Sequence, residues 1–299
     1  MVRTLDVLCV GHASYDHVFS VDHHPGPDEK LFAGGMIGCG GGPAANAAVT
    51  VARLGHRAGF MGYLGKDLHG ALHVEELLNE KVDTTAIIRG DQPTPVSVIL
   101  VKPDGTRSVT TFKGTSPSTS AQGAVTKRAP RVILMDGHEP DLSMAMMDGA
   151  AVTVLDAGSL HHGTEALMRR VDYLVCSEKF ATSIVGRGEP EDALRTLGEV
   201  APTVVITLGE RGLLWQHEGM KGRLSAFTIR ARDTTGAGDA FHGAFAAGLV
   251  RGLSWPDLLL FASAAGAACC EVLGARPGLP GDALIARILQ KESPLFSMG

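Results

Sequence analysis

Short apolar runs alternate with helix-length segments along most of the 299-residue chain. Runs such as "VTVL" and "VVIT" are apolar at nearly every position, which is typical of strands buried on both faces. The predicted strands are 5–10, 57–61, 131–135, 151–155, 171–175 and 203–207. The predicted helices are 43–54, 67–79, 140–148, 162–170, 178–185 and 190–199. This alternation predicts an α/β fold, a doubly wound and mostly parallel sheet flanked by helices.

Two regions depart from this pattern, residues 17–39 and 94–112, which look like extended, half-exposed strands. The stretch "PVSVILVKPDGTRSVTTF" joins two β-branched runs through "PDG", which predicts a hairpin. We expect these strands to form a small β-sheet lid, inserted at about 12–37 and 92–113 in a single domain spanning 1–299.

The C-terminal stretch 237–272 reads as two helices rich in alanine and glycine, which favours close packing. Phe241, Phe245 and Leu249 recur at every fourth position, so the sequence predicts that they form the buried face of the first helix.

Composition narrows the classes of partner. The net charge is −5 and the basic residues are scattered, so we expect no nucleic-acid partner. No apolar run approaches the roughly 18 residues of a membrane span, and we expect no membrane partner. The five cysteines are dispersed without a CxxC pair. They read as buried thiols in a reducing compartment, which favours a cytoplasmic location.

The stretch "DTTGAGDAFHGAF", residues 233–245, carries the strongest candidate chemistry. A glycine-rich turn before a helix exposes free backbone N–H groups at the positive end of the helix dipole. Gly236, Ala237 and Gly238 therefore predict a phosphate cradle. Asp239 beside a phosphate is repulsive unless it has a chemical role, and in phosphoryl transfer a carboxylate accepts the hydroxyl proton. The alternative is that Asp239 only caps the helix.

Two common nucleotide motifs are absent from the sequence. A dinucleotide GxGxxG fingerprint starting at Gly236 would need a third glycine where Phe241 stands, which disfavours a dehydrogenase. The Gly65-Lys66 pair is followed by Asp67, so it is not a P-loop.

Four segments together resemble the ribokinase-like (PfkB) carbohydrate kinases. They are "GCGGGPAANAAVTVARLG" at 38–55, "GYLGKDLHG" at 62–70, "TLGERG" at 207–212 and the stretch 233–245. The resemblance runs from Val7 to about Pro280. It implies phosphorylation of a sugar hydroxyl from ATP with Mg²⁺, with Asp239 as the base and the Gly236–Gly238 turn as the anion hole.

The resemblance also assigns binding residues. Asp16, Gly41, Gly42 and Asn46 match its sugar site, and a carboxylate such as Asp16 can accept hydrogen bonds from two neighbouring hydroxyls. Further candidates are Lys113 and His138 for substrate, Thr207, Gly209 and Gly212 for the nucleotide, and Asp233 and Thr235 for a monovalent cation such as K⁺.

One segment departs from the family pattern. Many relatives carry Asn-x-x-Glu after a strand, with the glutamate holding Mg²⁺ through water. Here "CSEKF" places Ser177 and Phe180 at those two positions. The adjacent Glu178 is then the candidate magnesium ligand, through water.

The substrate remains open at this point. "GGGPAANAAV" and "RPGLP" look most like ketose-directed members, such as fructokinases, ketohexokinases and sulfofructose kinases. A nucleoside kinase is the alternative; it needs an aromatic shelf, for which the lid offers Phe19, Phe32 and Phe112. A non-catalytic regulator that binds a sugar or nucleotide is the third possibility. Since family members often dimerise through the lid, we expect a homodimer.

Overall fold

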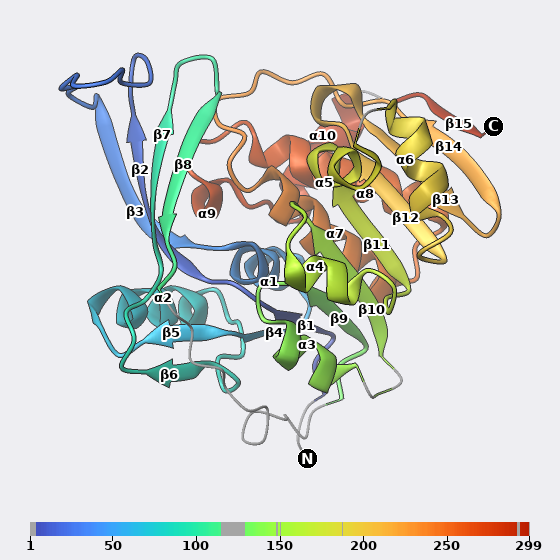
Figure 1. The fold of residues 1–299 in the computed structure, drawn as a ribbon, viewed down its shortest axis with the longest axis horizontal. Helices are drawn as coiled ribbons and strands as arrows, with labels where there is room; N and C mark the ends of the chain where they lie inside the picture. Colours follow the sequence, from blue (N-terminus) through green and yellow to red (C-terminus); the bar gives the residue numbers. More distant parts are fainter. Residues whose placement is uncertain are drawn as a thin grey trace.

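The main structural element is a nine-stranded sheet with the order β15-β14-β13-β12-β11-β10-β9-β1-β4 (Figure 1). The computed structural model describes residues 4–114, 129–147, 149, 151–186, 188–291 and 294–298. Six neighbouring strands of the sheet are parallel, and each overlaps a predicted strand: β1 (Val7–Val10), β4 (Ala58–Met61), β9 (Val132–Met135), β10 (Val152–Ala157), β11 (Tyr173–Ser177) and β12 (Thr203–Thr207).

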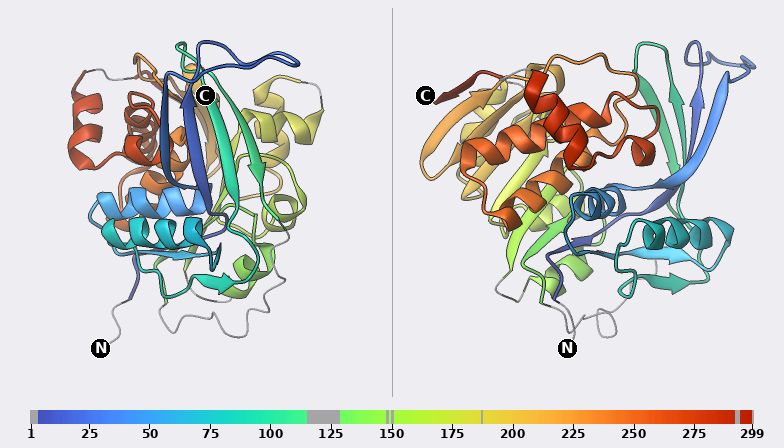
Figure 2. Two further views of the ribbon diagram at one scale, coloured as in Figure 1. Left: turned by 90° about the vertical axis from the view of Figure 1, so that its left-hand side faces the viewer. Right: turned by 180° about the vertical axis from the view of Figure 1, so that it is seen from behind.

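Helices cover both faces of this sheet, as expected for a doubly wound fold (Figure 2). One face carries α1 (Pro43–Arg53), α7 (Ala237–Arg251), α8 (Trp255–Cys269) and α10 (Asp282–Lys291). The other carries α3 (Pro140–Met146), α4 (His162–Leu167), α5 (Glu178–Val185) and α6 (Pro190–Leu197). Alternate residues of β1 supply the two cores: Val7 and Cys9 pack toward α1 and α7, whereas Leu8 and Val10 pack toward α3 to α6.

Helix α7 is more buried than its predicted apolar face requires. Phe241 and Phe245 are buried as expected, but Leu249 is only partly buried. The small residues between them, such as Ala244 and Ala247, are also fully buried because α7 packs against both α1 and α8. The prediction of a single buried face is therefore wrong for this helix, and its alanines and glycines allow the close approach of two neighbours.

The lid is a separate four-stranded sheet with the order β3-β2-β7-β8. Its strands are β2 (Ser14–Ser20), β3 (Gly35–Gly41), β7 (Val96–Val101) and β8 (Arg107–Phe112). Figure 1 shows these strands standing apart from the main sheet, with α2 (Leu68–Asn79) and the pair β5 (Tyr63–Gly65) and β6 (Ile88–Gly90) below them. The predicted hairpin is the β7–β8 pair, and β3 runs beyond the predicted lid boundary to Gly41.

The far edge of the main sheet was not predicted. Strands β13 (Leu213–His217), β14 (Met220–Leu224) and β15 (Phe296–Met298) extend it in antiparallel pairings beyond β12. A short helix, α9 (Ala275–Gly278), lies against β3. No helix in the described part of the chain is both long and apolar enough to cross a membrane.

Candidate active site

A pocket of about 320 Å³ lies at the carboxyl ends of β9 to β12, where open α/β sheets bind ligands. Four of its residues come directly from those strand ends, and others come from the start of α7 and from the lid. The lining residues are Pro43, Arg107, Asp136, His138, Asp156, Gly158, Ser159, His161, Ser177, Thr207, Gly236, Gly238, Asp239 and His242.

Asp239 stands in the first turn of α7 and faces this pocket. Its Oδ2 accepts a 2.7 Å hydrogen bond from Nδ2 of Asn46 on α1. Burial raises the pKa of Asp239 above its ordinary value, while the bond from Asn46 opposes that rise. The bond from Asn46 thus sets the orientation of the carboxylate, and burial makes it more basic than an exposed aspartate.

A buried arginine stands behind Asn46. Arg276 is 5% exposed, and its Nε donates to Oδ1 of Asn46 at 3.2 Å. Its two other nitrogens reach Oε2 of Glu76 at 3.4 Å and Nε2 of His73 at 3.1 Å. Because Arg276 occupies the amide oxygen, the amide nitrogen of Asn46 is the group that points to Asp239.

Asp16 lies at the base of the lid and is nearly buried. Its Oδ1 accepts a 2.7 Å bond from the Ser14 hydroxyl, and burial raises its pKa. A Cβ on Gly41 would lie 1.9 Å from Oδ2 of Asp16. A Cβ on Gly42, whose φ is +91°, would lie 2.6 Å from the backbone of Ala13. These glycines make room for protein atoms, including the Asp16 carboxylate itself.

The predicted phosphate cradle forms the start of α7. Gly236 caps the helix in the left-handed conformation, and a Cβ there would lie 2.6 Å from Cβ of Ala275. Ala237 and Gly238 follow as the first helical residues, and the amides of a first turn lack intrahelical acceptors. A Cβ on Gly238 would meet no atom within 4 Å, so the turn is open on the side that faces the pocket.

The turn after β12 contains the predicted nucleotide residues. Thr207 lines the pocket, and its hydroxyl donates to the Cys176 carbonyl at 3.3 Å. Gly209 and Gly212 both have positive φ, and a Cβ on Gly212 would lie 2.0 Å from the Leu224 carbonyl oxygen. A Cβ on Gly209 would meet nothing, so this turn presents open backbone.

Three histidine rings lie in a row beside the pocket, and two of them, His138 and His161, line it. His138 stacks on His161 with the ring centroids 4.8 Å apart, and His12 lies 5.1 Å from His138. Nζ of Lys113 reaches the His138 carbonyl at 3.4 Å. Burial lowers the pKa of His12 to about 3, so this ring is neutral at physiological pH.

Asp233 and Thr235 form a second polar cluster beneath the turn. Oδ1 of Asp233 accepts from the amide and the hydroxyl of Thr235, at 2.8 and 2.6 Å. Its Oδ2 accepts from the Gly274 amide at 2.8 Å, which ties this segment to α9. Asp233 is fully buried and makes no ion pair with a described residue.

Comparison with known proteins gives this arrangement a family. A sequence model of the pfkB family carbohydrate kinases matches residues 4–133 and 143–282. The chain belongs to this family. It is 28% identical to a ribokinase of Haemophilus influenzae, covering 94% of this chain and 96% of that protein. It is 24% identical to a probable fructokinase of Arabidopsis thaliana, covering 87% of this chain and 90% of that protein.

Solved structures agree with the fold. The structure of a putative ribokinase from Agrobacterium tumefaciens matches with a TM-score of 0.87 at 25% identity, covering 97% of this chain and 99% of that one. Arabidopsis thaliana ribokinase, solved with ribose and ATP, matches with a TM-score of 0.82 at 25% identity, covering 96% and 99%. A further relative by sequence, a nucleoside kinase of Methanothermobacter thermautotrophicus, is 25% identical, covering 94% of this chain and 94% of that protein.

The segment "CSEKF", residues 176–180, departs from the family pattern but has a structural role in this carbohydrate kinase. The Ser177 hydroxyl caps α5 by accepting from the Phe180 amide at 3.1 Å, and it donates to the Gly158 carbonyl at 2.8 Å. Phe180 is fully buried in the core. Glu178 forms an ion pair with Arg211 and does not line the pocket.

Sequence reasoning missed several pocket residues of the kinase, among them Asp136, Asp156 and Arg107. Asp136 accepts from the backbone amides of His12 at 2.7 Å and His138 at 2.9 Å, so it fixes the loop after β1. Asp156 lies 3.3 Å from Nδ1 of His242, and burial raises the pKa of Asp156 to about 7. The only signal for Asp156 was its place at a strand end.

The third missed residue is Arg107 of the lid. Its Nη1 donates to the Thr234 hydroxyl at 2.5 Å, beside the phosphate cradle. Its positive charge lowers the pKa of Asp239, against the larger effect of burial. The hairpin signal "PDG" located the lid strand that contains Arg107, but it did not show that this strand reaches the turn before α7.

Proposed function

We propose that the protein transfers the γ-phosphate of ATP to a primary hydroxyl of a small sugar, with Asp239 as the general base. The observation that carries this proposal is the position of Asp239. The open amides of the turn at Gly236 to Gly238 lie on one side of its carboxylate, and Asn46 lies on the other. A hydroxyl held beside Asp239 would face a phosphoryl group held by the turn, and a positioned carboxylate suffices as base for this reaction.

The amides at Gly236, Ala237 and Gly238 would stabilise charge on the transferring phosphoryl group. Arg107 adds a lid-borne positive charge next to this turn. Closure of the lid would then exclude water and limit wasteful hydrolysis of ATP. Asp16 and Asn46 would orient the sugar through its hydroxyls. His138 lines the pocket, and Lys113 lies beside it as a donor to the His138 carbonyl.

The turn containing Thr207, Gly209 and Gly212 would hold the nucleotide, a role supported by the related ribokinase solved with ATP. For Mg²⁺, the pocket carboxylate Asp156 fits better than Glu178, because Arg211 already pairs with Glu178. Among the described residues, no cluster of three or more metal-binding side chains is present. The nucleotide phosphates and water would therefore supply most of the ligands of this ion.

A monovalent cation such as K⁺ would fit beside Asp233 and Thr235. The fully buried Asp233 carboxylate has hydrogen-bond donors but no ion-pair partner within the described ranges. A buried carboxylate without a counter-charge is costly, and a bound cation relieves that cost. Carboxylate and carbonyl oxygens suit such an ion.

The sugar is a ketose such as fructose, or ribose. The ketose-like segments favour the first and the ribokinase relatives favour the second. A nucleoside is less well supported: Phe32 and Phe112 are 96% and 62% exposed, and neither of them nor Phe19 lines the pocket. The imidazole rings that line it belong to His138, His161 and His242, and a sugar can also contact such rings.

We also propose that the chain works as one lidded domain and forms a homodimer through the outer face of the lid. This face, formed by β3, β7 and β8, exposes Met36, Val98 and Phe112 at 61%, 41% and 62%. A row of exposed apolar side chains on a sheet is typical of an interface. A cytoplasmic location suits the five buried, unbridged thiols.

The test is ADP formation from ATP with Mg²⁺ and K⁺ across fructose, tagatose, ribose, sulfofructose, 2-keto-3-deoxygluconate, adenosine and inosine. We expect turnover with one of the sugars and a loss of about 10²- to 10⁴-fold in Asp239→Asn. Asp91→Asn is the matched control, because that side chain is 93% exposed. Turnover that survives Asp239→Asn would refute the assigned base. ATP binding without turnover on any compound would favour the non-catalytic regulator.

A further inference from the structure

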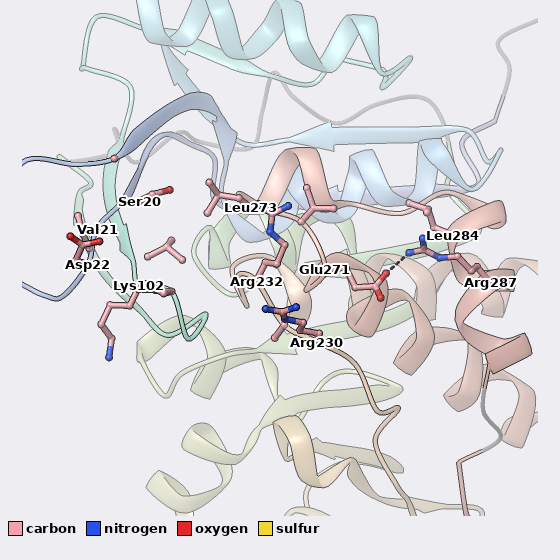
Figure 3. Close-up of a pocket in the computed structure, with 15 residues that line it drawn as sticks. Ser20, Val21, Asp22, Lys102, Arg230, Arg232, Glu271, Leu273, Leu284 and Arg287 are labelled. Carbon is pink, nitrogen blue, oxygen red and sulfur yellow. Dashed lines mark hydrogen bonds and ion pairs between the residues drawn. The ribbon is translucent and has the colours of Figure 1, made fainter.

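A cavity of about 890 Å³ lies outside the candidate active site. It opens between the far end of the lid and the C-terminal helices, and shares no residue with the pocket that contains Asp239 (Figure 3). Its lining residues from the lid are Ser20, Val21, Asp22, Gly34, Val101, Lys102 and Pro103. Those from the body are Arg230, Ala231, Arg232, Glu271, Val272, Leu273, Leu284 and Arg287.

Two arginines in this cavity have no ionic partner among the residues that the structure describes. Arg230 and Arg232 lie two positions apart, and Figure 3 shows them between the lid residues and the Glu271–Arg287 pair. Glu271 is already paired with Arg287 and with Lys291. No carboxylate of the described residues forms an ion pair with Arg230 or Arg232.

Arg230 and Arg232 are both exposed and line the same cavity, so an anion bound there would be attracted by two positive charges. Each guanidinium can grip a phosphate or carboxylate through two parallel N–H bonds. Two positive charges match a phosphate monoester, which carries about −1.5 to −2 at pH 7, better than a single carboxylate. Leu273 and Leu284 add apolar wall for the carbon part of such a ligand.

The cavity touches both the lid and the segment that leads into the candidate active site. Arg232 directly precedes Asp233, and its amide donates to the Cys270 carbonyl at 2.8 Å. At the tip of the β7–β8 hairpin, a Cβ on Gly105 would lie 3.4 Å from the Arg232 backbone. A ligand here would therefore bridge the lid and the segment that leads into the phosphate cradle.

A lid-mediated dimer leaves this cavity open. Ser20 pairs with Val101 and shares the inner face of the lid with Asp16, four residues before it on β2. The apolar side chains proposed for the dimer, such as Met36 and Phe112, lie on the opposite face.

We propose that this cavity binds a small phosphorylated metabolite, whose phosphate is held by Arg230 and Arg232, and that this ligand changes turnover by linking the lid to the body. The binding site does not depend on the proposed function, whereas the effect on turnover rests on it.

Calorimetric titration of the full-length protein tests the binding site, with pyrophosphate and glycerol 3-phosphate as probes and succinate as the carboxylate comparison. We expect binding of at least one phosphate probe, weakened about tenfold or more in Arg230→Gln/Arg232→Gln. The control is Arg223→Gln on β14, an exposed arginine outside both cavities. Equal affinity of the double variant and the wild type would overturn the site, and so would absence of binding. Tighter binding of succinate would overturn the phosphate assignment.

Turnover with the best substrate tests the second part. The phosphate probe is expected to change the rate of the wild type and of Arg223→Gln, but not of the double variant, whose rate without probe stays near that of the wild type. A probe that binds without changing turnover would overturn the link to the lid. Absence of turnover in all variants, with binding that depends on the two arginines, would count against the proposed function and leave the binding site supported.

Discussion

Nδ2 of Asn46 donates a 2.7 Å hydrogen bond to Oδ2 of Asp239, across 193 positions of sequence. This bond joins α1, which follows the lid strand β3, to the first turn of α7. It orients the carboxylate, while burial keeps its pKa raised. The proposed base is thus built from two segments that the sequence separates widely, and its geometry depends on how α1 and α7 pack.

Replacing Asp239 should separate activity from stability. Because its pKa is raised in the folded state, the ionised carboxylate is less favourable in the fold than in the unfolded chain. Asp239→Asn should therefore increase the free energy of unfolding at pH 8 while turnover is lost. The gain should shrink as the pH falls through the folded-state pKa, where the wild type becomes neutral. Urea titrations at a series of pH values from 8 downward measure it; a variant less stable than the wild type at pH 8 would contradict this account.

Arg276 should affect catalysis through Asn46. In Arg276→Met the Asn46 amide loses the donor at its oxygen, so its nitrogen is no longer directed to Asp239. We expect kcat to fall roughly tenfold, equivalent to about 1.4 kcal/mol, with little change in KM for ATP. Arg276→Lys should recover part of the loss because it keeps the charge. Steady-state kinetics measure both variants beside Arg195→Gln, whose side chain is 67% exposed. An unchanged kcat in Arg276→Met would exclude this role.

The sequence predicted the main fold because its signals are local. Continuous apolar runs marked the six parallel strands, and "PDG" marked the β7–β8 hairpin. The antiparallel edge was missed, since β14 and β15 are short and partly exposed, without a strong pattern. The family resemblance supplied Asp16, Asn46 and Asp239, which do lie near one another.

The supporting residues of the site could not be predicted in the same way. Arg276 lies 230 positions from Asn46, and Asp136 lies 124 positions from His12. A buried arginine or aspartate carries no local periodicity that reveals its partner. The glycine-rich segment at Gly41 was recognisable in the sequence, but the structure shows that Gly41 leaves room for the Asp16 carboxylate and not directly for a ligand.

Two glycines of the phosphate cradle should respond differently to alanine. Gly236 has a φ of +80° and packs against Ala275, so Gly236→Ala should lower stability by about 1–2 kcal/mol or more. Gly238 is helical and meets no neighbour, so Gly238→Ala should fold as well as the wild type or better. Its methyl group would enter the space proposed for the phosphate, and turnover should fall. Thermal unfolding and turnover separate the two effects; a fully active Gly238→Ala would argue against a phosphate at this turn.

The Asp156–His242 pair should make stability depend on pH near neutrality. Burial raises the pKa of Asp156 to about 7, from about 3.9 in an unfolded chain. The folded state therefore binds a proton more tightly than the unfolded chain, and this group should reduce stability as the pH rises from about 4 to about 7. Asp156→Asn should flatten that part of the profile. Urea unfolding from pH 4.5 to 8.5 in EDTA measures it, and parallel profiles of variant and wild type would contradict the assignment.

The outer face of the lid should determine the oligomeric state. Phe19 pairs with Met36 across β2 and β3, and Val96 pairs with Phe112 across β7 and β8. A charge placed among such side chains would be desolvated in a dimer but remain in water in a monomer. Met36→Glu/Phe112→Glu should therefore be monomeric by light scattering where the wild type is dimeric, with an unchanged circular dichroism spectrum. Leu295→Glu is the control, because that side chain is 74% exposed outside the lid. A monomeric wild type, or a dimer that survives both charges, would rule out this interface.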